Sequence, residues 1–159
     1  MKILMVCLGN ICRSPLAEGI MQEKIRERGL EWSVDSAGTG SWHIGEKPDV
    51  RSISEARRNG IDITRQRARQ FKPADLDQFD LILAMDNSNL RNIQNLITNK
   101  EQGKKVHLIM DLAHPGNRTD VPDPYWDDDG FSRVYRMLDT ACDKILDGLL
   151  QGEIRIPVS

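Results

Sequence analysis

The sequence predicts an α/β fold in which helices cover both faces of a parallel sheet. Two observations favour it. Short apolar runs of strand length recur along the chain, and segments with helical spacing of apolar residues alternate with them. The 159 residues are enough for one domain with its own hydrophobic core, and no repeat, low-complexity tract or interdomain linker interrupts them.

The first strand is expected at residues 2–7, where KILMVC is typical of a strand buried on both faces. The helix that follows has Ser14 as its expected N-cap and Pro15 at its first position. Its apolar residues recur at helical spacing as far as Gly29, a natural stop. The segment CLGNICR therefore joins the carboxyl end of a strand to the amino end of a helix.

The same alternation continues along the chain. Further strands are expected at residues 31–36, 79–85 and 106–110, and further helices at 49–59 and after 86. A long irregular segment then leads to a final helix. Its apolar stripe consists of Phe131, Val134, Leu138, Cys142, Ile145 and Leu149.

The composition excludes several classes of protein. Hydrophobic residues make up 39% and charged residues 29%, which is ordinary for a globular protein. A net charge of −2 argues against a dedicated nucleic-acid binder. No apolar run approaches the roughly 20 residues of a membrane span, and the first one is too short for a signal peptide. Three cysteines do not make a disulfide framework, so we expect a reducing, cytoplasmic setting.

The loop CLGNICRS has the features of an oxyanion site. It lies beyond the carboxyl end of a strand, where ligands bind in such sheets, and a helix amino end adds a positive dipole. Gly9 and Asn10 tolerate the left-handed backbone angles that a tight nest of N–H groups requires. Arg13 adds a planar fork suited to two oxygens. These features favour an anion of about phosphate size.

Cys7 lies at the expected floor of this nest. The helix end, the loop amides and Arg13 all favour its thiolate form, and Ser14 can donate a hydrogen bond to the sulfur. We therefore interpret Cys7 as a nucleophile under a bound phosphoryl group. A lone cysteine at a strand end more often serves packing, and this is our interpretation of Cys142. Cys12 either fills space behind the loop or traps an oxidised Cys7 as a reversible disulfide.

Two other interpretations of the loop fail. Cysteines of a structural zinc site usually stand two to four residues apart and occur with a second pair, which this chain lacks. A nucleotide-binding Walker loop needs Gly-Lys-Ser/Thr, which is missing.

Cleavage of a phosphate monoester needs a proton for the leaving oxygen. Asp123 is the candidate donor because Pro122 and Pro124 stiffen its backbone. Tyr125 and Trp126 follow it and can shield it from water, which favours the protonated acid.

Aromatic residues are expected to wall the site. Trp42 lies in the glycine-rich loop after the second strand, and with Tyr125 and Trp126 it would form a slot for a flat ring. A local excess of arginine is interpreted as a solvated basic face. It comprises Arg51, Arg57, Arg58, Arg65, Arg67 and Arg69.

The chain resembles a known family, the low-molecular-weight protein tyrosine phosphatases. The resemblance covers nearly the whole chain and rests on the segments VCLGNICRSPLAEG, DSAGTGSWHIGEKPD, ARQF, FDLILAMDNSNL and DPYW. It implies that residues 1–159 form one such domain, a three-layer sandwich with a four-stranded parallel sheet. It also implies a two-step mechanism through a phosphocysteine, with no metal and no cofactor.

The resemblance assigns roles to individual residues. Cys7, Arg13 and Asp123 would be catalytic. Ser36 would support the loop from behind. The phosphate- and substrate-binding residues would be Leu8, Gly9, Asn10, Ile11, Cys12, Ser14, Trp42, Tyr125 and Trp126.

The implied partners are phosphotyrosine-containing proteins and a tyrosine kinase, with inorganic phosphate as product, no nucleic acid and no membrane. The chain would be a monomer or a weak dimer.

Three alternatives to tyrosine phosphatase activity stay open. Protein-arginine phosphatases resemble this loop closely but carry a threonine where this chain has Ile11, whose branched apolar side chain suits a phenyl ester better. Thioredoxin-coupled arsenate reductases need further cysteines after the third strand, and LAMDNSNL has none. A phosphate-binding module without turnover would not need the intact set of Cys7, Arg13 and Asp123.

Overall fold

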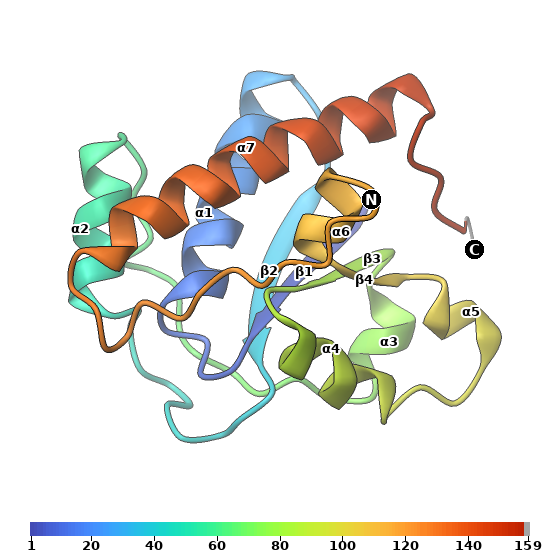
Figure 1. Ribbon diagram of the computed structural model, residues 1–159, viewed down its shortest axis with the longest axis horizontal. Coiled ribbons are helices and arrows are strands. Elements are labelled where there is room, and N and C mark those ends of the chain that lie inside the picture. Colours follow the sequence, from blue (N-terminus) through green and yellow to red (C-terminus); the bar gives the residue numbers. More distant parts are fainter. Residues whose placement is uncertain (158–159) are drawn as a thin grey trace.

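The computed structural model describes residues 1–157, and its centre is a sheet of four parallel strands (Figure 1). β1 (Lys2–Cys7) lies between β2 (Ser33–Gly38) and β3 (Leu81–Ala84). β4 (Val106–Leu108) pairs with β3 at the edge. Because every pair is parallel, the carboxyl ends of all four strands meet at one edge of the sheet. The predicted four-stranded parallel sheet is confirmed.

Helices cover both faces of this sheet (Figure 1). On one face, three helices pack against one another: α1 (Arg13–Glu27), α2 (Val50–Arg58) and α7 (Gly130–Gln151). The other face carries shorter helices: α3 (Asp75–Gln78), α4 (Asn87–Gln94) and α5 (Lys100–Gly103). α6 (Ile109–Ala113) continues directly from β4 and packs against α7. Among residues 1–157, no helix combines the length and the apolarity needed to cross a membrane.

The central strand explains why the core has two halves. Ile3 and Met5 on β1 belong to the apolar cluster shared with α1, α2 and α7. Leu4 and Val6 point to the opposite side and belong to the cluster shared with α3 and α4. All four side chains are fully buried, and each contributes about 1.5–3 kcal/mol to folding. The continuous apolar run therefore fixes β1 at the centre of the sheet.

Three predicted strands differ from the observed ones at their ends. The strand expected at 79–85 is shorter and lies at Leu81–Ala84. The strand expected at 31–36 lies at Ser33–Gly38, because its partner β1 pairs Lys2 with Ser33 and Cys7 with Gly38. The strand expected at 106–110 ends at Leu108, which pairs with Ala84, the last residue of β3. Without a partner strand beyond that point, the chain turns into α6. For β2 and β4, pairing decides the boundary.

Candidate active site

The loop between β1 and α1, residues 8–12, curls around a point above the end of β1. We call it the phosphate loop. Asn10 has φ 58°, the left-handed region that asparagine tolerates. Its side-chain nitrogen donates to Ser14 Oγ at 2.7 Å and to Ser36 Oγ at 2.9 Å, and its Oδ1 accepts from the Arg69 amide at 3.0 Å. Gly38 lets the loop lie against β2, since a Cβ there would come within 2.7 Å of the Leu8 carbonyl oxygen.

Cys7, the last residue of β1, is buried with its sulfur under this loop. Its Sγ lies 2.9 Å from Ser14 Oγ and accepts from the Asn10 amide at 3.3 Å. Because Asn10 already donates to Ser14 Oγ, the Ser14 hydroxyl hydrogen is free to point at the sulfur. The N-terminus of α1 is also directed at this point, which favours negative charge.

Ser14 is not the N-cap that the sequence predicts. α1 begins at Arg13, and Cys12 occupies the cap position without a capping side-chain bond. The Ser14 hydroxyl contacts the Cys7 sulfur instead. Serine often caps a helix, but here it is a hydrogen-bond partner of the sulfur.

Arg13 is almost fully buried and held by two anchors. Its Nη1 donates to Asp86 Oδ2 at 2.7 Å and to the Val121 carbonyl at 2.9 Å. Burial lowers the pKa of Arg13, but the charges of Cys7 and Asp86 raise it, and the net shift is upward. Nη2 lies 3.8 Å from Asp123 Oδ2 and has no closer ion-pair partner among residues 1–157. The guanidinium is therefore fixed on one side and open to a ligand on the other.

Asp86 is a site residue that sequence reasoning missed. It follows β3 at the same edge of the sheet as the phosphate loop, and this position could have drawn attention to it. It also accepts from the Asn89 amide at 2.7 Å as the N-cap of α4, which is the signal that the sequence shows. The same carboxylate thus starts a helix and holds Arg13.

A cavity of about 190 Å³ opens above Cys7. It is lined by ten residues that the sequence singled out and by His43, which it did not. The predicted ones are Cys7, Leu8, Gly9, Ile11, Cys12, Arg13, Trp42, Asp123, Tyr125 and Trp126. Asn10 belongs to the loop, and its side chain donates to Ser14 and Ser36 behind it. All the predicted site residues are therefore brought together.

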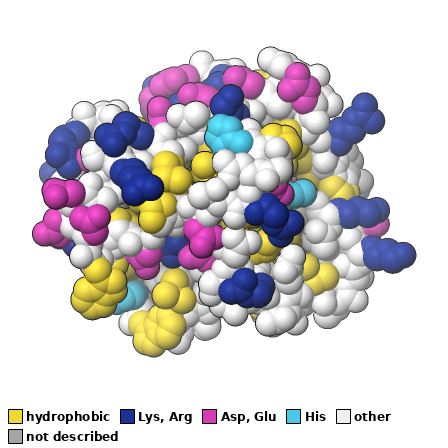
Figure 2. All heavy atoms as spheres, in the orientation of Figure 1, with side chains coloured by type: hydrophobic (Ala, Val, Ile, Leu, Met, Phe, Trp, Pro, Cys, Tyr) yellow, Lys and Arg dark blue, Asp and Glu magenta, His cyan; other side chains and the backbone are white. Residues whose placement is uncertain are grey.

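The rim of the cavity is aromatic and exposed. Trp42 is 70% exposed and Trp126 is 90% exposed. The Tyr125 and Trp126 rings pack edge to face, with their centroids 4.8 Å apart. Figure 2 shows hydrophobic side chains protruding at the edge where the loop between β2 and α2 lies in Figure 1. Large exposed rings beside a cavity mark a surface for a ligand or a partner.

Arg51, on α2, clamps residues 120–129, which we call the acid loop. Its Nε and Nη2 donate to the two oxygens of Asp49 at 2.9 Å each, and its Nη1 donates to Asp128 Oδ1 at 2.6 Å. The guanidinium also lies 5.5 Å from the centre of the Tyr125 ring. The sequence places Arg51 on a solvated basic face, whereas the structure connects it to the acid loop.

A sequence model of the family described as low molecular weight phosphotyrosine protein phosphatase matches residues 2–154. The chain belongs to this family. The phosphatase is therefore a hydrolase, and the resemblance drawn from its sequence is confirmed.

Individual relatives agree with the family. A low molecular weight phosphotyrosine protein phosphatase of Schizosaccharomyces pombe is 45% identical over 143 residues, which cover 86% of this chain and 89% of the relative. The crystal structure of a protein tyrosine phosphatase from Entamoeba histolytica matches with a TM-score of 0.89 and 36% identity, over 97% of this chain and 99% of that one. A Drosophila arginine phosphatase matches with a TM-score of 0.87 and 32% identity, over 94% and 98%.

Proposed function

We propose that this phosphatase hydrolyses phosphotyrosine in proteins, and small aryl phosphates, through a phosphocysteine. The Cys7 thiolate attacks phosphorus in line with the leaving phenol oxygen, so that an S–P bond forms as the O–P bond breaks. Arg13 and the amides of the phosphate loop hold the three equatorial oxygens, whose charge needs stabilising in the transition state. The observation that carries the proposal is that Cys7, Arg13 and Asp123 line one small cavity.

Asp123 supplies the proton in the first step and removes one in the second. Its carboxyl protonates the leaving phenolate oxygen. The resulting carboxylate then takes a proton from water as that water attacks the phosphocysteine, which releases inorganic phosphate. Support comes from its position, since its Oδ2 lies 3.8 Å from Arg13 Nη2 and its side chain is 42% exposed at the cavity wall.

The clamp on the acid loop yields a first prediction. In Arg51→Ala the acid loop loses its bonds to α2, and misplacement of Asp123 should lower kcat for phenyl phosphate about tenfold. In kcat/KM, which reports the first step alone, dinitrophenyl phosphate should lose much less than phenyl phosphate, because its phenolate leaves without a proton. Steady-state kinetics on the two esters measure the difference, with Arg51→Lys as an intermediate case. An equal loss on both esters would mean that Arg51 supports only the fold.

Selectivity for a phenyl ester is assigned to Ile11. Its side chain lines the cavity near the aromatic rim of Trp42 and Tyr125, so a flat ring meets apolar surface on its way to Cys7. The likeness to an arginine phosphatase shows that one fold accommodates either substrate, which leaves the choice to local residues. A branched apolar chain offers no hydrogen bond to a guanidinium.

A substitution of Ile11 tests this assignment. Ile11→Thr should shift the ratio of kcat/KM for phosphotyrosine over phosphoarginine toward phosphoarginine by about tenfold, the usual worth of one such pocket contact. Phosphate release from matched phosphotyrosyl and phosphoarginyl peptides measures the ratio. Ile44→Thr, at an exposed position that does not line the cavity, is the control. An unchanged ratio in Ile11→Thr would refute the assignment.

Cys12 is proposed as a redox partner of Cys7. Burial raises the pKa of Cys12 to about 12, so it stays a thiol and does not compete as a nucleophile. If a peroxide oxidises Cys7 to a sulfenic acid, the Cys12 thiol can condense with it to give a disulfide and water. Both cysteines are free and buried in the structure, and both line the cavity.

A setting and partners are part of the proposal. The substrates are phosphoproteins, and we propose that a tyrosine kinase produces them and that the enzyme acts in the cytoplasm as a monomer or weak dimer. The deciding assay is hydrolysis of an aryl phosphate and of a phosphotyrosyl peptide in the presence of EDTA. We expect full turnover with the chelator present. No turnover on either substrate would refute the proposed function.

A further inference from the structure

The hydrogen bonds behind the phosphate loop do not end at Ser36. Ser36 Oγ donates to Glu18 Oε1 at 2.6 Å and accepts from Asn10 Nδ2 at 2.9 Å. The same Asn10 nitrogen donates to Ser14 Oγ, which contacts Cys7 Sγ at 2.9 Å. One continuous chain of hydrogen bonds therefore runs from Glu18, on α1, to the sulfur on β1.

The chemistry of the amide fixes the direction of every bond in this chain. An amide nitrogen only donates, so Ser36 and Ser14 must both accept from Asn10. The hydroxyl hydrogens of the two serines then point outward to the two ends of the chain, where Glu18 and Cys7 accept. Each end is a group that carries negative charge in its ionised form. The carboxylate and the thiolate thus share one central donor.

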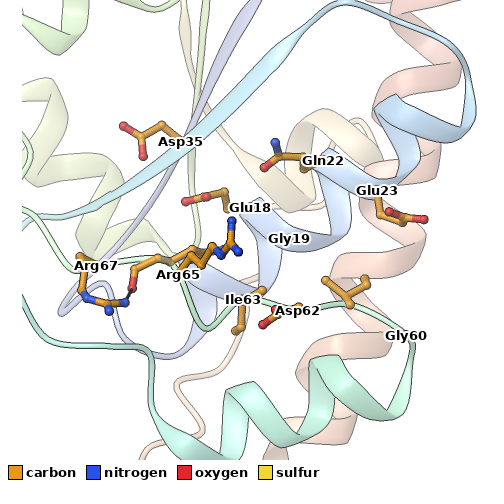
Figure 3. Close-up of a pocket in the computed structure, with 12 residues that line it drawn as sticks. Glu18, Gly19, Gln22, Glu23, Asp35, Gly60, Asp62, Ile63, Arg65 and Arg67 are labelled. Atoms are coloured by element: carbon orange, nitrogen blue, oxygen red, sulfur yellow. Dashed lines mark hydrogen bonds between the residues drawn. The ribbon is translucent and has the colours of Figure 1, made fainter.

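Glu18 lines a cavity of about 570 Å³ behind the site, shown in Figure 3. The cavity lies between α1, β2 and the segment after α2, and it connects Glu18 with solvent. Burial raises the pKa of Glu18 to about 7, against the opposing hydrogen bond from Ser36, and the nearby charge of Asp35 adds to the rise. The charged groups that face it are Glu23 on α1, Asp35 on β2, and Asp62, Arg65, Arg67 and Arg69 on the segment after α2.

Three of the six neighbouring charged groups form ion pairs with other residues. Asp35 pairs with Arg69 at 3.0 Å, and Glu23 pairs with Arg26. Within residues 1–157, Glu18 has no ion-pair partner of its own, so Ser36 is the group that holds its side chain. Glu18 therefore can change its charge near neutral pH without breaking a salt bridge.

We propose that Glu18 is a positioning residue for Cys7. It acts through Ser36, Asn10 and Ser14: its carboxylate anchors Ser36 and thereby holds the Asn10 amide that shapes the phosphate loop. Its negative charge, when present, also disfavours the thiolate at the other end of the chain. The protonation of Glu18 thus sets how reactive Cys7 is across neutral pH. This inference depends on the proposed function in one respect, namely that Cys7 is the nucleophile.

Alkylation of Cys7 by iodoacetamide, followed against pH, tests the proposal, because its rate follows the fraction of thiolate. The wild-type profile should contain a second step near pH 7, where Glu18 titrates. Glu18→Gln, which keeps a carbonyl acceptor for Ser36, should lack that step and react about threefold faster at pH 7 because a nearby charge is gone. Glu18→Ala also removes the acceptor and should lower kcat about fivefold, the worth of one hydrogen bond.

Glu23→Gln is the matched control, because Glu23 lines the same cavity and is outside the hydrogen-bond chain. Its alkylation profile should coincide with the wild-type profile. The proposal is overturned if Glu18→Gln retains the step near pH 7, or if Glu23→Gln removes it. Should Glu18→Ala fail to fold, the Glu18→Gln profile decides alone. Phosphatase activity retained in Cys7→Ser would refute the proposed function instead, and the alkylation profiles do not depend on turnover.

Discussion

Replacing Cys7 with serine should reduce phosphate release by a factor on the order of 10⁵–10⁶, the loss typical of removing a nucleophile. A serine hydroxyl at the same place stays protonated, because Ser14 and the Asn10 amide provide hydrogen bonds but no base. Turnover of phenyl phosphate measures the loss. Full activity in Cys7→Ser would remove Cys7 from the mechanism.

The phosphate site itself should survive this substitution. Arg13 keeps its bonds to Asp86 and to the Val121 carbonyl, and the amides of the phosphate loop are unchanged. Inorganic phosphate should therefore still bind to Cys7→Ser, as calorimetry can show. Cys142→Ala is the control, because this cysteine lies fully buried in α7 and should leave kcat near the wild-type value.

Replacing Asp123 with asparagine should lower kcat for phenyl phosphate by about 10²–10⁴, the usual worth of a general acid. The loss should be far smaller in the first step with dinitrophenyl phosphate, whose phenolate needs no proton. Hydrolysis of the phosphocysteine still lacks its base, so this intermediate should accumulate. Rapid quenching followed by mass measurement of the protein detects the added phosphoryl group.

The matched control for this carboxylate is Asp120→Asn. Asp120 is on the acid loop as well, but its Oδ1 accepts from the Asn87 amide at 2.8 Å and it does not line the cavity. Its kcat should stay within about threefold of wild type, since an exposed hydrogen bond contributes little. If Asp120→Asn lost as much as Asp123→Asn, the assignment of the acid would be wrong.

Local sequence signals predicted most of the fold. The run at residues 2–7 became β1 with the predicted bounds, since a strand buried on both faces leaves a continuous apolar pattern. The ends of β2 and β4 were misplaced because pairing with β1 and β3 sets them, and single-chain patterns do not contain the register. The short helices α3, α5 and α6 were missed, since four or five residues carry too little periodicity.

The sequence predicted those parts of the candidate site whose residues are consecutive. It did not predict contacts between residues that lie far apart in the chain. The phosphate loop could be interpreted from residues 7–14 because anion nests need their residues in sequence. Asp86, Glu18 and Arg51 were not found. Each acts through a partner far away in the chain, and the sequence alone shows only a helix cap, a helical acid and a surface arginine.

The position of Val121 is fixed by hydrogen bonds, and this limits where homologues can differ in loop length. Its amide donates to the Met85 carbonyl at 2.9 Å, and its own carbonyl accepts from Arg13. Hydrogen bonds therefore hold both backbone polar groups of this residue. The irregular segment at residues 114–117 makes only local hydrogen bonds within the described residues, so it can gain or lose residues without displacing Asp123. Homologues should tolerate insertions upstream of this fixed point and resist them between it and the acid.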